Sequence, residues 1–147
     1  MSEHDSVPTT DPAHERPPGT DDATVAAVGK LSEAWEWIER ARGHLYDFHQ
    51  MMGHADLTVG EAADELEAAG HAHHAELLRR EIIGRNVLEG RWTFQVVEEY
   101  DDDYYSPVRE VEARVRGDLM GGKRHVFEAE MKEQRRTHGK PGHEPAP

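Results

Sequence analysis

A single stripe of apolar side chains over residues 23–53 constrains the fold of this chain more than any other feature. Steps of three and four residues, or their sums, separate Val28, Leu31, Trp35, Ile38, Leu45 and Met52. That spacing places side chains on one side of an α-helix, and Ala34, Ala41 and Phe48 widen the stripe. We expect one long helix that ends at Gly53, with the stripe turning polar at Arg42 and His49.

Shorter helices are expected after this one. Thr58 and Glu61 have the spacing of a capping box, so a second helix is predicted to begin there and to end at Gly70. A third helix is predicted to run to about Leu88. Together these two helices would form a short hairpin over residues 58–88.

The segment "RWTFQVVEEYDDDYYSPVREVEARVRGDLMGG" allows two interpretations at its start. Trp92 to Val97 has residues that favour a strand, but one apolar face that continues to Leu119 favours a helix. Pro107 either starts a new helix, with Ser106 as N-cap, or kinks a single long one.

A last helix is expected from about Lys123 to Thr137, after the pair Gly121–Gly122. The fold class that follows is all-α: an irregular antiparallel bundle of four to five helices. It would hold two long helices, the short hairpin and the C-terminal helix, in one domain over residues 23–137. Residues 1–22 and 138–147 are rich in proline and poor in large aliphatic side chains, which predicts disordered tails.

Composition excludes several classes of function. The formal charge is −13, with 30 acidic and 17 basic residues, which argues against binding nucleic acid or an anionic membrane surface. No apolar run suggests a membrane span or a signal segment, so we expect a cytoplasmic protein. The chain has no cysteine, which excludes disulfides and thiol catalysis. It also lacks Glu-x-x-His, His-Glu-x-x-His, Gly-x-Ser-x-Gly and a P-loop.

Polar side chains from four segments are predicted to meet at one end of the bundle. Arg42 and His49 lie on the apolar stripe, where polar groups require partners. The residues we expect around a ligand pocket are Arg42, His49, Asn86, Arg91, Gln95 and Glu98. The alternative is an ordinary polar bundle end that is open to water.

A metal site is the second interpretation of the same region. Its ligands would be His49, His54, Asp56 and Glu99, or Glu98 in place of Glu99. The sequence names no cofactor beyond this divalent metal ion. The cluster His71, His73 and His74 supplies too few ligands at metal spacing, and it is interpreted as a polar turn.

Three stretches of the chain, "WIERARGHLYDFHQMMGHAD", "GRNVLEGRWTFQVVEEYDDDYY" and "RHVFEAEMKEQRRTHG", carry a family resemblance. In them the chain resembles a group of small actinobacterial proteins of unassigned function. The resemblance implies no activity, cofactor or catalytic residue.

The function expected from these observations is a non-enzymatic module that binds a protein partner or a small polar ligand. In the pairs Trp35/Trp37 and Tyr104/Tyr105 the two members cannot both point inward, so the outward ones are candidates for a homodimer or partner interface. The alternative function is a metal-dependent enzyme or metalloprotein that uses the His, Asp and Glu ligands named above.

Overall fold

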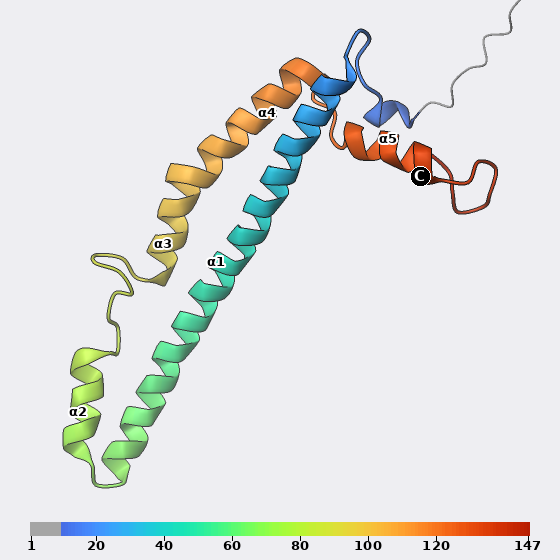
Figure 1. The fold of residues 1–147 in the computed structure, drawn as a ribbon. Coiled ribbons are helices and arrows are strands. Elements are labelled where there is room, and N and C mark those ends of the chain that lie inside the picture. The colour runs from blue at the N-terminus through green and yellow to red at the C-terminus, as the bar shows by residue number, and fades with distance from the viewer. Residues whose placement is uncertain (1–9) are drawn as a thin grey trace, which may run out of the picture. The chain divides into compact units, whose positions relative to one another are not determined.

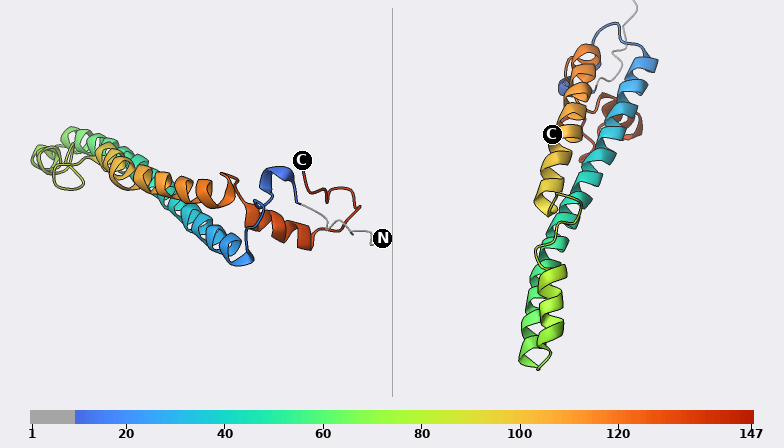
Figure 2. Two further views of the ribbon diagram at one scale, coloured as in Figure 1. Left: turned by 90° about the horizontal axis from the view of Figure 1, so that it is seen from above. Right: turned by 90° about the vertical axis from the view of Figure 1, so that its left-hand side faces the viewer.

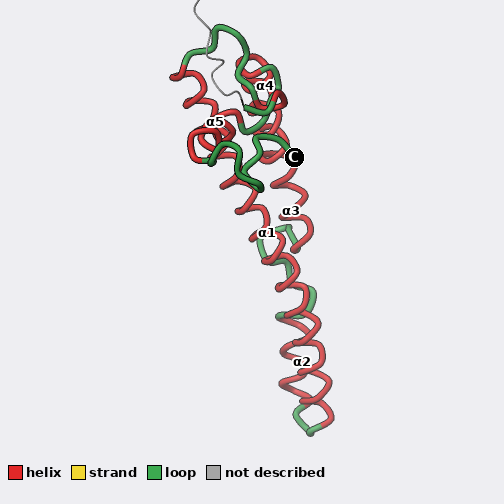
Figure 3. The backbone as a smooth tube through the Cα atoms, turned by 90° about the vertical axis from the view of Figure 1, so that its right-hand side faces the viewer, coloured by secondary structure: helices red, strands yellow, loops and turns green. Residues whose placement is uncertain are grey.

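The computed structural model describes residues 10–147, and these residues form a series of helices (Figure 1). The α-helices are α1 (Asp22–Ala68), α2 (Ala72–Glu81), α3 (Thr93–Tyr100), α4 (Ser106–Met120) and α5 (Val126–Arg135). A 3-10 helix, η1, covers Pro12–His14, and a π-helical segment, η2, covers Asp101–Tyr105. The described residues form no strand beyond an isolated bridge between Leu88 and Arg91, so the all-α prediction is confirmed (Figure 3).

The described residues form two compact units. Unit 1 comprises Met1–Trp37, described from residue 10, together with Val108–Pro147, and unit 2 comprises Ile38–Pro107. No helix within residues 10–147 has both the length and the apolar character needed to cross a membrane.

Helix α1 is longer than predicted. The predicted end at Gly53 and the predicted new start at Thr58 are both wrong, because α1 runs without a break to Ala68. Gly53 has no positive φ angle, so its backbone fits a helix like that of any other residue. The Thr58 hydroxyl donates to the carbonyl of His54 at 2.9 Å, a bond that is made inside a helix and not at its N-cap.

The true end of α1 is the glycine cap predicted at Gly70. Gly70 has φ +89°, and the amides of Gly70 and His71 donate back to the carbonyls of Glu67 and Leu66. This is the Schellman arrangement, which satisfies carbonyls that the helix end would otherwise leave unpaired.

Helix α2 lies beside the C-terminal part of α1 (Figures 1 and 2). The guanidinium of Arg79 binds Asp64 at 2.9 Å and Glu67 at 2.7 Å. The helix ends at Glu81 and not near Leu88 as predicted. The backbone accounts for this end, because the Ile83 amide donates to the carbonyl of Leu78 and Gly84 has a positive φ of +74°. Asp56 on α1 then accepts the amide of Gly84 at 2.8 Å.

The segment from Thr93 to Met120 is helical throughout, which confirms the helical interpretation of the "WTFQVV" stretch. Pro107 does not start a new helix, since Ser106 already has helical angles (φ −66°, ψ −46°). The π-helical turn η2 precedes it, with the Ser106 amide donating to the carbonyl of Asp101. Proline lacks an amide hydrogen and its ring collides with the carbonyl four residues earlier, and a π-turn is one of the local adjustments that accommodate such a break.

In unit 2, α1 and α3 pack in opposite directions. Arg42 contacts Asp101, and seven residues further along α1, His49 contacts Thr93. The later residue of α1 contacts the earlier residue of the segment formed by α3 and η2. The two segments therefore run antiparallel, which confirms the predicted arrangement there. The contact between His49 and Thr93 places the middle of α1 against the start of α3.

Few apolar side chains are fully buried. In unit 1, Val25, Val28, Met120 and Val126 form one cluster. Gly29 permits close packing there, because a Cβ at this position would lie 2.8 Å from the Cβ of Phe127. In unit 2 the fully buried apolar residues are Ala63, Ala75 and Val97, and larger side chains such as Ile38, Leu45 and Leu66 are partly buried.

The two predicted tails make specific contacts where they are described. Residues 1–9 lie outside the described residues. Arg16 binds both Asp22, at 2.8 Å, and Glu130 of α5. Near the other end of the chain, Arg136 donates to the carbonyl of His143 at 3.1 Å. The composition of these segments does not predict such contacts.

Candidate functional site

Arg42 lies at the centre of a polar network in unit 2. Its guanidinium donates to both carboxylate oxygens of Asp101, at 2.9 and 3.0 Å, and stacks over the ring of Tyr105 at 4.2 Å. The Tyr105 hydroxyl in turn donates to Glu39 at 2.6 Å. The hydrogen bond from Arg42 lowers the pKa of Asp101 below its ordinary value. This network joins the π-helical turn η2 to α1. Its charged groups, Arg42, Asp101 and Glu39, each have a hydrogen-bond partner within it.

His49 is the second polar residue on the apolar stripe, and its partner is a hydroxyl group. Its Nδ1 lies 2.7 Å from Oγ1 of Thr93, and Thr93 is 1% exposed. The prediction that Arg42 and His49 need partners in the core is therefore confirmed. Both side chains join α1 to the segment that begins at Thr93, and neither lines the hollow described next.

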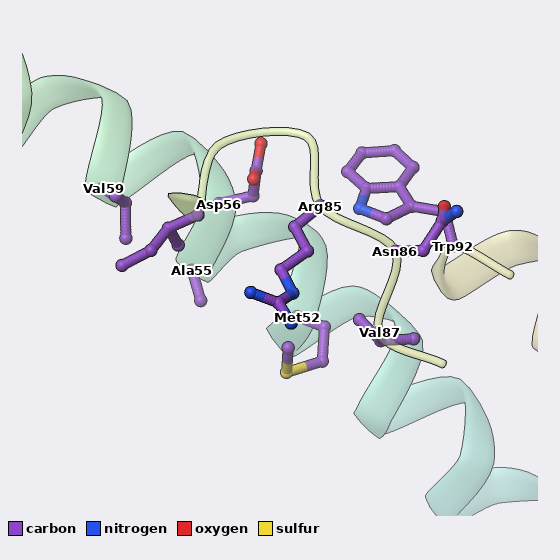
Figure 4. A pocket seen from close by; sticks show the side chains of 9 residues that line it. Met52, Ala55, Asp56, Val59, Arg85, Asn86, Val87 and Trp92 are labelled. Atoms are coloured by element: carbon purple, nitrogen blue, oxygen red, sulfur yellow. The ribbon is translucent and has the colours of Figure 1, made fainter. Parts of the chain in front are cut away.

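A hollow of about 260 Å³ lies between α1 and the segment that connects α2 to α3 (Figure 4). Its walls are mostly apolar. The lining residues are Met52, Ala55, Asp56, Val59, Ile82, Arg85, Asn86, Val87 and Trp92.

The polar side chains that line the hollow differ in the hydrogen bonds that they already form. Asp56 is held by the amide of Gly84. Arg85 extends from the connecting segment toward α1, with its guanidinium end beside Met52 (Figure 4), and it donates only a long bond of 3.4 Å to the carbonyl of Glu81. The hollow thus offers apolar walls and one guanidinium.

The remaining predicted pocket residues do not point into this hollow. Arg91 forms an ion pair with Glu99, which lowers the pKa of that carboxyl group. The side-chain oxygen of Gln95 accepts the amide of Trp92 at 2.7 Å, at the N-terminus of α3, and Glu98 is exposed. Of the six predicted pocket residues, only Asn86 lines the hollow. The predicted convergence of all six on one cavity is therefore corrected.

The predicted metal ligands are not brought together either. Within residues 10–147 no three or more His, Asp or Glu side chains are grouped so that they could hold a metal ion. Asp56 is bound to the Gly84 amide, Glu99 to Arg91, and His49 to Thr93. His54 is exposed on α1.

Comparison with known proteins adds no assignment. No model of a protein family, no curated protein and no solved structure matches this chain. The resemblance to small actinobacterial proteins stays a prediction.

One feature of unit 2 was not identified as a site from the sequence. Ala41, Phe48, Met51, Met52 and Ala55 of α1 are all exposed, and we call them the α1 face. Phe48 is 39% exposed and Met51 is 64% exposed. The sequence does carry the signal, because Ala41, Phe48 and Met52 belong to the apolar stripe predicted for this helix, and Met51 and Ala55 extend it at helical spacing.

The α1 face is not the side of the helix that meets α3. His49 follows Phe48 directly, so its side chain lies about 100° further around the helix. Arg42 and His49 therefore face α3. The α1 face lies about 100° away around the helix, so α3 does not cover it. Met52 and Ala55 also line the hollow, so the α1 face and the hollow form one continuous apolar surface.

Proposed function

We propose that this chain is a non-enzymatic interaction module that binds a protein partner through the α1 face. The observation that carries the proposal is the imbalance between buried and exposed apolar side chains in unit 2. Three small or medium side chains are buried, whereas ten large ones are exposed. The exposed ones are Tyr46, Phe48, Met51, Met52, Leu57, Leu77, Ile82, Leu88, Phe94 and Tyr104.

Exposed apolar side chains are ordinary when they are scattered over a surface. On α1, Phe48, Met51 and Met52 instead lie on one side of the helix, beside a mostly apolar hollow. Contiguous apolar surface of this kind marks sites of protein interaction. Exposed aromatic and methionine side chains are also the residues that interfaces favour.

The hollow fits this function better than it fits catalysis or binding of a polar ligand. Its walls are mostly apolar, and Asp56, the carboxylate among its lining residues, already accepts the amide of Gly84. An apolar side chain of the partner would contact these walls, and the Arg85 guanidinium would donate to a hydrogen-bond acceptor of the partner at the edge.

Photochemical cross-linking in the cells that produce the protein tests the proposal. A photoreactive phenylalanine analogue replaces Phe48 with little change in size. The matched control carries the same analogue at Gln50, an exposed residue of α1 that lies about 200° around the helix from Phe48. We expect covalent protein adducts from position 48 and few from position 50. Equal or absent adducts at the two positions would overturn the proposal.

A further inference from the structure

We infer that the partner of the α1 face is a second copy of this chain, so that two copies of unit 2 form a four-helix bundle. This inference rests on the proposed function and names its partner. It follows from the need for cover, the area of the apolar surface, and the distribution of charge.

Unit 2 on its own leaves much of its apolar surface exposed to water. Unit 2 spans 70 positions, Ile38–Pro107, and its buried apolar residues are Ala63, Ala75 and Val97. Ordering each residue costs about 1–2 kcal/mol of backbone entropy, and large apolar side chains of the unit such as Ile38, Leu45 and Leu66 are only partly buried, so burial offsets this cost less completely than in a closed core. A partner that covers the α1 face supplies further burial whenever the unit is folded. A second copy is the partner that is always present in equal amount, and symmetric pairs are the commonest assemblies of soluble chains.

The exposed area matches what a stable pair requires. A large apolar side chain that is about half exposed leaves on the order of 100 Å² uncovered. Phe48, Met51, Met52 and Ile82 of the α1 face and the adjoining hollow therefore present on the order of 400 Å². This is the same order as the apolar share, a little over half, of the about 800 Å² that a standard interface buries per partner.

The two antiparallel helices of unit 2 have the arrangement of one half of a four-helix bundle. Unit 2 pairs α1 with α3 in opposite directions and leaves one side of α1 open. The open residues Ala41, Phe48 and Ala55 are seven positions apart, the repeat with which helices pack side by side. Two antiparallel pairs joined through such stripes make a four-helix bundle.

Charge favours a second copy over a basic partner. Unit 2 contains 15 acidic and 6 basic residues, which gives a net charge of −9 with histidine neutral. Over residues 41–55 the charged residues are only Arg42 and Asp47. Arg42 is paired with Asp101, and Asp47 lies about 100° from Phe48 around α1. The α1 face is therefore uncharged, so two copies can meet there without burying like charges, whereas a basic partner would find no carboxylate to bind.

Sedimentation of the purified full-length chain over a range of concentrations tests the inference. We expect a species of twice the chain mass of 16.6 kDa, and a melting temperature that rises with protein concentration, as it does for a folded pair. We expect Phe48→Glu to shift the species to the single-chain mass. Gln50→Glu adds the same charge to another side of α1, and it should leave the pair intact.

Salt separates the two kinds of partner. Screening of the net negative charge should leave the pair unchanged or strengthen it, while a complex with a basic partner would weaken. If Phe48→Glu fails to fold, the photoreactive analogue at position 48 of the purified protein replaces it, with an adduct of two chains as the expected product.

A single-chain mass at high micromolar concentration, with a melting temperature independent of concentration, would overturn the inference. A pair that survives Phe48→Glu as well as Gln50→Glu would also overturn it, because the contact would lie elsewhere. If position 48 then forms adducts with another protein in cells, the proposed function stands and only the second copy is excluded as the partner. If position 48 forms no adduct at all, both the proposed function and the second copy are excluded.

Discussion

Arg42 and Asp101 are 59 positions apart in the sequence and meet through two parallel hydrogen bonds, from Nε to Oδ1 at 2.9 Å and from Nη2 to Oδ2 at 3.0 Å. Their side chains are 27% and 24% exposed, so water screens the pair only in part. The pair joins α1 to the π-helical turn and fixes how the two antiparallel segments of unit 2 are aligned.

Asp101→Asn is expected to lower the free energy of unfolding by about 1–3 kcal/mol, because it removes the charge from a hydrogen-bonded, partly buried pair. The hydrogen bond from Arg42 lowers the pKa of Asp101 in the folded state. The stabilisation is therefore present above the ordinary carboxyl pKa of about 3.9 and is lost as the pH falls through the lowered value. Denaturant unfolding at several pH values should show the difference between wild type and variant shrinking below about pH 4. A difference that is constant with pH would contradict the role of the charge.

His49 and Thr93 are expected to be energetically coupled. His49→Ala leaves a hydroxyl that is buried and without this partner, whereas in a Thr93→Val background there is no hydroxyl to leave unpaired. The cost of His49→Ala should therefore be smaller in that background, by about 1 kcal/mol. A double-mutant cycle of unfolding free energies measures this coupling. Strictly additive effects would show that the 2.7 Å contact contributes nothing.

Gly53 and Gly70 should respond in opposite ways to alanine. Gly53 lies inside α1, and an added Cβ would have no atom within 4 Å, so Gly53→Ala is expected to stabilise by about 0.5–1 kcal/mol. Gly70 has φ +89°, so Gly70→Ala is expected to destabilise by about 1 kcal/mol. Thermal unfolding of the two variants distinguishes a continuous α1 from the helix break predicted at Gly53, for which both variants would destabilise.

The metalloprotein alternative makes a different prediction. Since His49, Asp56 and Glu99 each bind another group of the protein, we expect protein purified without an affinity tag to contain far less than one transition metal ion per chain. Elemental analysis provides the measurement. A stoichiometric metal that disappears in His49→Ala would favour the metalloprotein over the interaction module.

The regular parts of the fold were predictable because they follow from local spacing. The apolar stripe from Val28 to Met52 correctly predicts a long helix, and the single face from Thr93 to Leu119 correctly predicts a helix where the residue types favour a strand. Gly70 was assigned correctly because its backbone does require a left-handed conformation. Gly53 and Thr58 were misassigned, since each residue type is common at helix ends but is also tolerated inside a helix.

The candidate site was less predictable, because its contacts join distant positions. The sequence shows that Arg42 and His49 need partners, but it cannot select Asp101 and Thr93 among the many polar residues available. The helical spacing of the α1 face is present in the sequence, but the sequence places Phe48 in a widened apolar stripe that is expected to face the core. Only the position of α3 shows that this side of α1 has no helix against it within the described part of unit 2.

The oxidation rate of Met51 measures whether a second copy covers the α1 face. In the single chain Met51 is 64% exposed and Met131 of α5 is 45% exposed, so exposure alone predicts that Met51 reacts faster with peroxide. If a second copy covers the α1 face, Met51 will react more slowly than Met131 at high protein concentration and will recover its reactivity on dilution. Mass spectrometry of the two peptides reports both rates. Faster oxidation of Met51 at every concentration would contradict the account.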